Sequence, residues 1–285
     1  MSTFATPEPI FLVLDVGVGF TELTASDRDD TVVEVRPSDP ANETDRRTAE
    51  QTRVERTADG VLVRAPKQRG FGVFGSKPGS IDVTVELPTD SRVQAEIGAG
   101  GVRCAGRIGE CRVKTGVGDI QLEHTGVLTA DAGAGSVTVR RIVGTAEVST
   151  GSGSIRVHQI DGNAVLKNSN GDNWVDEVSG ELRMTSANGS VVANHVGASV
   201  TAKSANGDVR VGDVTRGTAS LKTALGAIEV GIHAGTAARL DVSTDFGRVH
   251  NNMESTDGPA ATDETVDVQA HTSFGDIVIR RAVHS

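Results

Sequence analysis

The chain has 285 residues and a net charge of −10, and it is 37% hydrophobic but only 3% aromatic, with 34 glycines. Neither its first 90 residues nor the remainder is basic, which argues against nucleic acid as a partner. The first 20 residues have no positively charged start, and Asp15 interrupts their apolar run. We therefore expect no signal peptide, no membrane span and a cytoplasmic location.

Residues 10–90 predict an irregular N-terminal part. The phrase DVGVGFTEL (15–23) aligns with DAGAGSVTV (131–139), so a repeat already begins near Asp15. The polar stretch Asp39–Gln51 favours a short surface helix. Alternating strand patterns occupy residues 31–37, 52–56, 60–65 and 80–87. Phenylalanines near the start predict that this end of the chain is capped; they are Phe4, Phe11 and Phe20.

A loop at 66–79, PKQRGFGVFGSKPG, interrupts these strands. It places Phe71 and Phe74 among glycines and beside the basic residues Lys67, Arg69 and Lys77. Because surface loops on rigid frames often carry recognition, these five residues are candidate contacts for an acidic protein surface or an anionic polymer. The alternative is that both rings pack against the neighbouring strands as a lid.

From Gly100 onward, one short phrase returns at a nearly fixed period. TGVGDIQL (115–122), TGSGSIRV (150–157), SANGDVRV (204–211) and TSFGDIVI (272–279) are variants of it. Its glycine recurs 17 to 19 residues apart, at Gly100, Gly118, Gly135, Gly153, Gly171, Gly189, Gly207 and Gly226. A repeat of this length predicts a solenoid, in which each coil buries its apolar face against its neighbours.

Each repeat predicts two short strands and a third, straighter edge separated by turns. After Gly153, Ile155 and Val157 alternate with Ser154 and Arg156, which is the pattern of a half-buried strand. A small polar residue three positions before each glycine predicts a ladder of hydrogen bonds at the corner. We thus expect an all-β, single-stranded parallel β-helix of about 18 residues per coil, regular over 91–250. The expected core includes Ile155, Val157, Ile160, Leu166, Val175, Leu182 and Val209, with Arg156 and Arg210 exposed.

The C-terminal part departs from this period. Residues 251–265 are polar and predict a flexible insertion between coils, and Val266–Arg280 restores the motif as the terminal coil of a single domain 1–285. Cys104 and Cys111 are the two cysteines of the chain. They fall on apolar columns of one coil, and we expect them to be buried free thiols.

The sequence offers no clear motif for catalysis or metal binding. Asp119, Asp172 and Asp208 follow repeat glycines, but serines interrupt this column, which argues against repeated calcium sites. The outward columns assemble no paired carboxylates for cleaving glycosidic bonds. We therefore expect no enzyme activity, no cofactor and no metal. Trp174 is the exception: either its strand slips by one residue and the ring turns inward, or the outer face presents an aromatic contact.

The repeat, together with TVVEVRP (31–37), AEQTRVE (49–55), VRAP (63–66) and SIDVTVELP (80–88), resembles a bacterial adhesin-like family of unknown function called toastrack. The resemblance covers essentially the whole chain and looks like the actinobacterial cytoplasmic branch. It implies a right-handed β-helix without catalytic residues, and hence a scaffold or adhesin-like module that presents stacked outer faces to a protein or polymer. The alternative is a self-assembling solenoid resembling bactofilin-type filament formers, and a carbohydrate-active enzyme is least favoured. We expect a monomer or a small oligomer.

Overall fold

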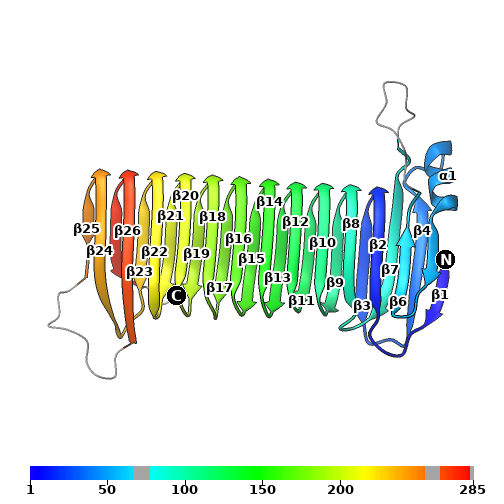
Figure 1. Cartoon of the computed structure of the whole chain (residues 1–285), viewed down its shortest axis with the longest axis horizontal. Helices are drawn as coiled ribbons and strands as arrows, with labels where there is room; N and C mark the ends of the chain where they lie inside the picture. Colours follow the sequence, from blue (N-terminus) through cyan, green and yellow to red (C-terminus); the bar gives the residue numbers. More distant parts are fainter. Residues whose placement is uncertain (67–77, 254–263, 283–285) are drawn as a thin grey trace. The chain divides into compact units, whose positions relative to one another are not determined.

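The computed structural model describes residues 1–66, 78–253 and 264–282 (Figure 1). Apart from one helix, the regular elements of the described chain are β-strands, and most neighbouring strands are parallel. The chain divides into two compact units, Met1–Arg140 and Arg141–Ser285. Within each unit, two sheets of parallel strands stack coil upon coil, so the parallel β-helix predicted from the sequence is confirmed.

Unit 1 contains the helix and the first repeats. The strand order is β1-β4-β7-β3-β9-β11 in one sheet and β12-β10-β8-β2-β6-β5 in the other. Its elements are β1 (Ser2–Ala5), β2 (Phe11–Val18), β3 (Thr21–Ser26), β4 (Asp30–Pro37), α1 (Glu43–Gln51), β5 (Arg53–Arg56), β6 (Gly60–Arg64), β7 (Ile81–Pro88), β8 (Arg92–Ala99), β9 (Val102–Ile108), β10 (Cys111–Val117), β11 (Ile120–Thr125) and β12 (Leu128–Ala134). The division falls within β13 (Val137–Val143).

Unit 2 contains the remaining repeats. The strand order is β15-β17-β19-β21-β23-β27-β25 in one sheet and β14-β16-β18-β20-β22-β26-β24 in the other. Its strands are β14 (Ala146–Ser152), β15 (Ile155–Asp161), β16 (Ala164–Asn170), β17 (Asn173–Val178), β18 (Leu182–Asn188), β19 (Val191–Val196), β20 (Val200–Asn206), β21 (Val209–Val214), β22 (Gly217–Leu225), β23 (Ile228–Ile232), β24 (Thr236–Phe246), β25 (Val249–Asn251), β26 (Glu264–Phe274) and β27 (Ile277–Arg281).

A coil consists of two strands, without the third edge that the sequence pattern suggested. In β15, Ile155 and Val157 point inward, and Gln159 breaks the alternation so that Ile160 also points inward. The residues expected on a third edge therefore end the first strand of the coil. Arg156 and Arg210 are exposed, as predicted. All the predicted core residues of these repeats are buried: Ile155, Val157, Ile160, Leu166, Val175, Leu182 and Val209.

The repeat glycine is required at the corner that follows the second strand. Gly189 has a φ of 140°, and a Cβ there would lie 2.2 Å from the carbonyl oxygen of Gly171 in the preceding coil. The small polar residue of the following coil donates to the glycine carbonyl, as Ser204 Oγ does to Gly189 O at 2.9 Å. Thr223 and Thr272 repeat this bond one and two coils further on, which confirms the predicted ladder.

One end of unit 1 is closed by antiparallel strands and the helix. The coil β6–β7 lies beyond β2–β3, although it follows β2–β3 in the chain. Outside it, β5 pairs antiparallel with β6, while β4 and then β1 continue the other sheet antiparallel. The predicted helix is confirmed as α1, whose buried Asp45 accepts a hydrogen bond from the Ser80 amide at 2.9 Å. These elements form the cap. Of the three phenylalanines expected to cap this end, Phe4 lies in β1 of the cap, whereas Phe11 lies in β2 within the stack and Phe20 is exposed.

One end of unit 2 departs from the chain order in the same way. β26 pairs with β22 on one side and with β24 on the other, and β27 likewise lies between β23 and β25. The coil Val266–Arg280, expected to be terminal, is therefore the penultimate coil. β24 and β25 form the outermost coil of the described chain at this end (Figure 1).

Candidate binding surface

Successive coils of unit 1 carry a glycine at the same position near the end of a strand. These glycines are Gly17, Gly98, Gly116 and Gly133, and a Cβ on any of the last three would lie 2.4 Å from the carbonyl oxygen of the glycine before it. Glycine has no side chain to cover the backbone there, and the next residue of each coil is apolar. Val18, Ala99 and Val117 are register partners at this next position, and Val117 is 59% exposed.

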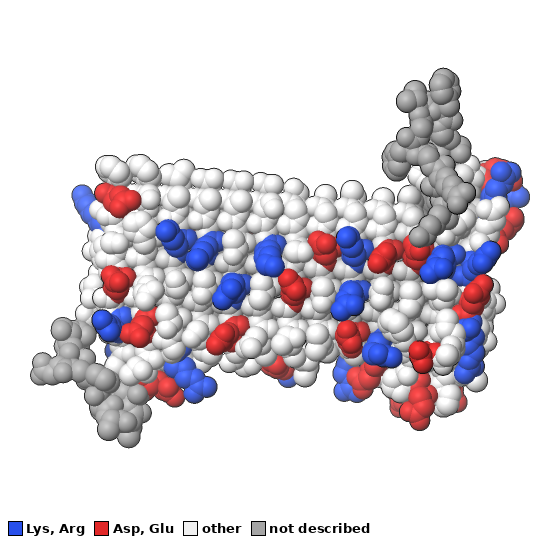
Figure 2. All heavy atoms as spheres, viewed as in Figure 1, with Lys and Arg blue, Asp and Glu red and all other residues white. Residues whose placement is uncertain are grey.

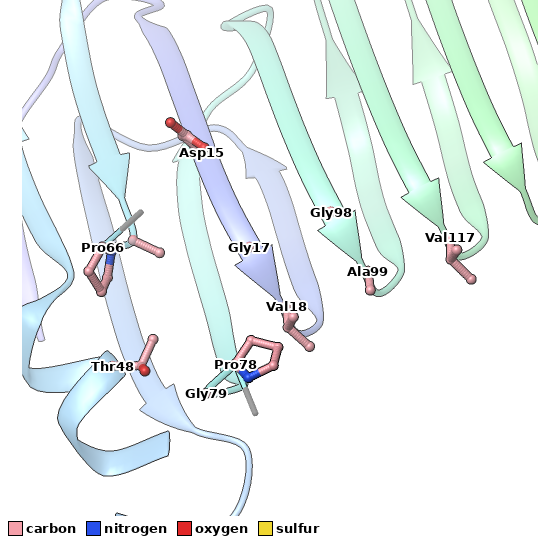
Figure 3. A pocket seen from close by; sticks show the side chains of 11 residues that line it. Asp15, Gly17, Val18, Thr48, Pro66, Pro78, Gly79, Gly98, Ala99 and Val117 are labelled. Atoms are coloured by element: carbon pink, nitrogen blue, oxygen red, sulfur yellow. The ribbon is translucent and has the colours of Figure 1, made fainter. Parts of the chain in front are cut away.

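The apolar residues that follow these glycines, Val18, Ala99 and Val117, border a pocket of about 420 Å³ in unit 1 (Figure 3). Figure 3 shows Val18, Ala99 and Val117 at the ends of neighbouring strands, with Pro78 beside Val18. The rest of the lining comes from α1 and from the ends of β2, β6, β7 and β8, and is mostly apolar: Asp15, Gly17, Thr48, Ala65, Pro66, Gly79 and Gly98. The volume is within the usual range of ligand pockets, so the pocket can accept apolar side chains of a partner.

Charge is placed at the margin of this pocket. Among the described lining residues, Asp15 is the one that carries a charge, and its Oδ2 lies 3.5 Å from Arg64 Nε. A second hollow of about 500 Å³ shares Ala65 and Pro66 with the first and is also lined by Gln51, Arg53 and Arg64. Arg53 has no ion-pair partner within residues 1–66, 78–253 and 264–282. An apolar pocket therefore adjoins a site of positive charge.

The loop candidates predicted from the sequence lie outside the described residues: Lys67, Arg69, Phe71, Phe74 and Lys77. Pro66 and Pro78, the described residues that flank this segment, both line the apolar pocket. Sequence reasoning did not identify the pocket residues themselves. A signal was present in DVGVG (15–19), EIGAG (96–100) and KTGVG (114–118), where an apolar residue stands between two glycines at a corner and cannot turn inward.

Trp174 lies on the outer face of β17, and its strand does not slip. Asn173 is fully buried and pairs in register with Ile155 and Val191, which leaves Trp174 outward between Arg156 and Val192. The indole is half-buried and meets the ring of His158 edge-on, with 5.2 Å between centroids. Of the two alternatives, the structure shows an aromatic group on the outer face.

The aspartates that follow repeat glycines have a structural role. Asp172 Oδ1 accepts from the Ser190 amide, and Asp208 Oδ1 accepts from the Ala227 amide, both at 2.8 Å in the next coil. Asp119 does the same for Ser136. Among the residues that the structure describes, no group of three or more His, Cys, Asp and Glu side chains is arranged to hold a metal ion.

Both cysteines are buried free thiols, as predicted. Burial raises the pKa of the Cys104 thiol from 9.0 to about 12, and it raises the pKa of Cys111 in the same direction. Because the thiolate is the reactive form, neither side chain is suited to nucleophilic chemistry at neutral pH.

Charged side chains are scattered over the faces of the strands and along the lower edge of the view, whereas the upper edge, where the even-numbered strands from β8 to β24 end, carries few of them (Figure 2). In unit 2 these ends carry stacked asparagines, with Asn206 Nδ2 donating to Asn188 Oδ1 at 2.8 Å. No helix in the described part of the chain has the length and hydropathy needed to cross a bilayer.

Comparison with known proteins identifies a family for this fold. A family model described as Toastrack DUF4097 matches residues 20–280. A structure from Clostridium sporogenes described as a "putative cell adhesion protein" aligns with 98% of this chain and 98% of its own, at 11% identity and a TM-score of 0.24. A Bacteroides fragilis "putative adhesin" aligns over 98% and 95%, at 12% identity and a TM-score of 0.34. The comparison with curated proteins gave no match.

Proposed function

This chain belongs to the Toastrack DUF4097 family, and we propose that it acts in the cytoplasm as a non-enzymatic scaffold, an adhesin-like module that binds a protein partner through the apolar pocket of unit 1. The pocket is the observation that carries this proposal. Aliphatic side chains such as Val117 remain open to solvent along its floor. Covering such a side chain with a partner contributes roughly 1 to 2 kcal/mol of binding free energy.

The margin of the pocket suggests the chemistry of the partner. Arg53 and Arg64 line the hollow that adjoins it. Basic side chains beside an apolar anchor site favour a partner segment that carries an acidic residue next to an apolar one. This preference agrees with the acidic partner predicted from the loop 66–79.

The non-enzymatic role is supported by what the polar side chains of the repeats do. The aspartates, serines and threonines at the corners bond backbone groups of neighbouring coils, so they serve the stacking of the solenoid. The cytoplasmic location is supported by the two buried free thiols, which suit a reducing compartment. Fractionation of the source cells, followed by detection of the chain, tests the location directly.

The pocket is tested by a matched pair of substitutions. Val117→Asn changes the pocket floor, whereas Val127→Asn changes another aliphatic residue of unit 1, 46% exposed, that does not line the pocket. A partner is first identified by affinity capture from the source organism with the unchanged protein. We expect Val117→Asn to lower the recovery of this partner at least about tenfold, and Val127→Asn to leave it unchanged.

Direct contact is checked by placing a photo-crosslinking amino acid at position 117 or at position 127. Crosslinks to the partner should form only from position 117. Equal recovery with both asparagine variants, together with crosslinks from neither position, would exclude the pocket as the binding site.

A further inference from the structure

The outermost coil of unit 2 exposes a long strand edge. β24 runs from Thr236 to Phe246, and among the described residues it pairs with β26 and with no other strand. Thr236 is bonded within the chain, since its amide donates to His233 O and its carbonyl accepts from Arg281. Beyond it, the edge presents backbone donors and acceptors that pair with no other described strand, a feature that natural proteins usually block or pair. The other strand of this coil, β25, is only three residues long. A partner strand that adds to this end would therefore have its register set mainly by β24.

The side chains of β24 show that its inward face is uncovered. Ala238, Leu240 and Val242 point the same way as the core residues of the neighbouring coils, yet all three are only half-buried. Their register partners in β26, Val266, Val268 and Ala270, are buried. A coil stacked on β24 would bury these three side chains in the same way.

The outward face of β24 carries a pair of unpartnered charges. Ser243 and Asp245 both contact His271, with Ser243 Oγ 3.1 Å from His271 Nδ1 and Asp245 Oδ2 3.8 Å from His271 Nε2. Arg239 and Asp241 are exposed; their register partners in β26 are Asp267 and Gln269, and neither forms an ion pair in the described part of the chain. They flank Leu240, one residue to either side.

We propose that two copies of this chain associate through β24, which pairs antiparallel with β24 of the second copy about a two-fold axis at Leu240. In an antiparallel pair centred on one residue, the residues on either side lie opposite each other. Arg239 of each copy then faces Asp241 of the other, which gives two ion pairs. On the inward face, Leu240 meets Leu240 and Ala238 meets Val242. The ladder covers residues 237–243 and joins two solenoid ends.

Charge and strand geometry select this register. Centring the pair on Arg239 would oppose two arginines, and centring it on Asp241 would oppose two aspartates, both unfavourable. Centring it on Val242 would place Arg239 opposite Asp245, which already contacts His271, and would leave Asp241 opposite a serine. A centre between two residues would set inward side chains against outward ones. The surface is self-complementary, as a two-fold interface requires, and it is separate from the unit 1 pocket.

Charge reversal tests the pairing. We expect the unchanged chain to form dimers in sedimentation velocity, and Arg239→Asp or Asp241→Arg to raise the dissociation constant at least about tenfold. An equimolar mixture of these two variants should dimerise again, because each supplies the charges that the other lacks. The double variant Arg239→Asp with Asp241→Arg should also dimerise. Lys203→Asp, an exposed change on β20, is the control and should have no effect.

The register is tested by Leu240→Cys and Val242→Cys under mild oxidation. A disulfide between copies should form from position 240 and not from position 242. A chain that stays monomeric up to about 1 mM, where even weak association is detected, overturns the proposal. Dimers that Arg239→Asp does not weaken, or a mixture of the two reversed variants that stays monomeric, overturn it equally.

Discussion

Asn173 is the residue at which the repeat pattern and the core of unit 2 disagree. It occupies an inward position between Ile155 and Val191 and is fully buried. Its Nδ2 donates to Thr185 O at 3.3 Å, but its Oδ1 has no hydrogen-bond partner in the described structure. A buried acceptor without a donor is destabilising by about 1 to 3 kcal/mol.

We predict that Asn173→Val stabilises the protein. The change removes the unsatisfied oxygen and restores the β-branched column, so the free energy of unfolding should rise by about 1 kcal/mol. Urea denaturation monitored by circular dichroism measures it. The reverse change at the next inward position, Val175→Asn, should lower stability by about 2 kcal/mol or more, since Val175 is fully buried. A loss of stability with Asn173→Val would mean that the amide has a role which the hydrogen bonds do not show.

The buried thiols predict how the protein responds to pH and to alkylating agents. An unfolded thiol ionises near its ordinary pKa of 9.0, whereas folded Cys104 keeps its proton up to about 12. The folded state therefore binds more protons between these values, so this contribution to stability is complete below pH 9.0 and is lost as pH rises toward 12. At pH 8, iodoacetamide should leave both cysteines unmodified in the native protein and modify both after unfolding, as measured by mass spectrometry. Rapid native modification of either one would contradict this burial.

At the scale of the repeat, the corner glycine meets two requirements, a positive φ and a close approach to the preceding coil, and a pair of substitutions can separate them. Gly189 and Gly235 both have positive φ, 140° and 86°. A Cβ on Gly189 would lie 2.2 Å from Gly171 O, whereas a Cβ on Gly235 has nothing within 4 Å. Gly235→Ala should therefore lower stability by about 1 kcal/mol, the cost of the backbone conformation alone. Gly189→Ala should lower it by more than about 3 kcal/mol, because the coils must also move apart. Thermal unfolding distinguishes the two, and equal losses would show that coil spacing adjusts freely.

The strands and corners were largely predictable, because each coil repeats the same local sequence pattern. The alternation of Ile155 and Val157 predicts a buried strand face, and the glycine and small polar residue predict the corner. The prediction of a third edge was wrong because strict alternation ends at Gln159. Two residues, His158 and Gln159, separate the inward Val157 from the inward Ile160, so the sequence pattern placed Ile160 on a separate edge, whereas it belongs to the same strand. The pocket was missed because it depends on which strands become neighbours in unit 1. The orientation of Trp174 could not be decided from the sequence. The polar Asn173 stands where an apolar residue is expected, so a strand shifted by one residue, with Trp174 inward, fitted the pattern equally well.

At the scale of the whole molecule, the order of coils in space is the property that the repeat pattern does not encode. Every coil carries nearly the same phrase, so any two can stack. In unit 2 the coil β26–β27 nevertheless lies between β22–β23 and β24–β25. The same exchange occurs in unit 1, where β2–β3 lies between β6–β7 and β8–β9. The consequence is that β24 depends on a strand that is synthesised after it.

This dependence gives the last prediction. Val268 of β26 is buried between its register partners Ala219 of β22 and Leu240 of β24. A carboxylate there is buried without a partner, which costs several kcal/mol and should release β26 from the stack. Because β24 has no other described neighbour, Val268→Asp should abolish hydrogen-exchange protection of residues 236–246 together with that of β26, while β18 stays protected. The control Gln269→Lys places a charge at the adjacent exposed position, opposite Asp241 of β24, and should leave the exchange pattern unchanged. If coils followed one another in chain order, β24 would rest on β22, and its amides would stay protected in the Val268→Asp variant.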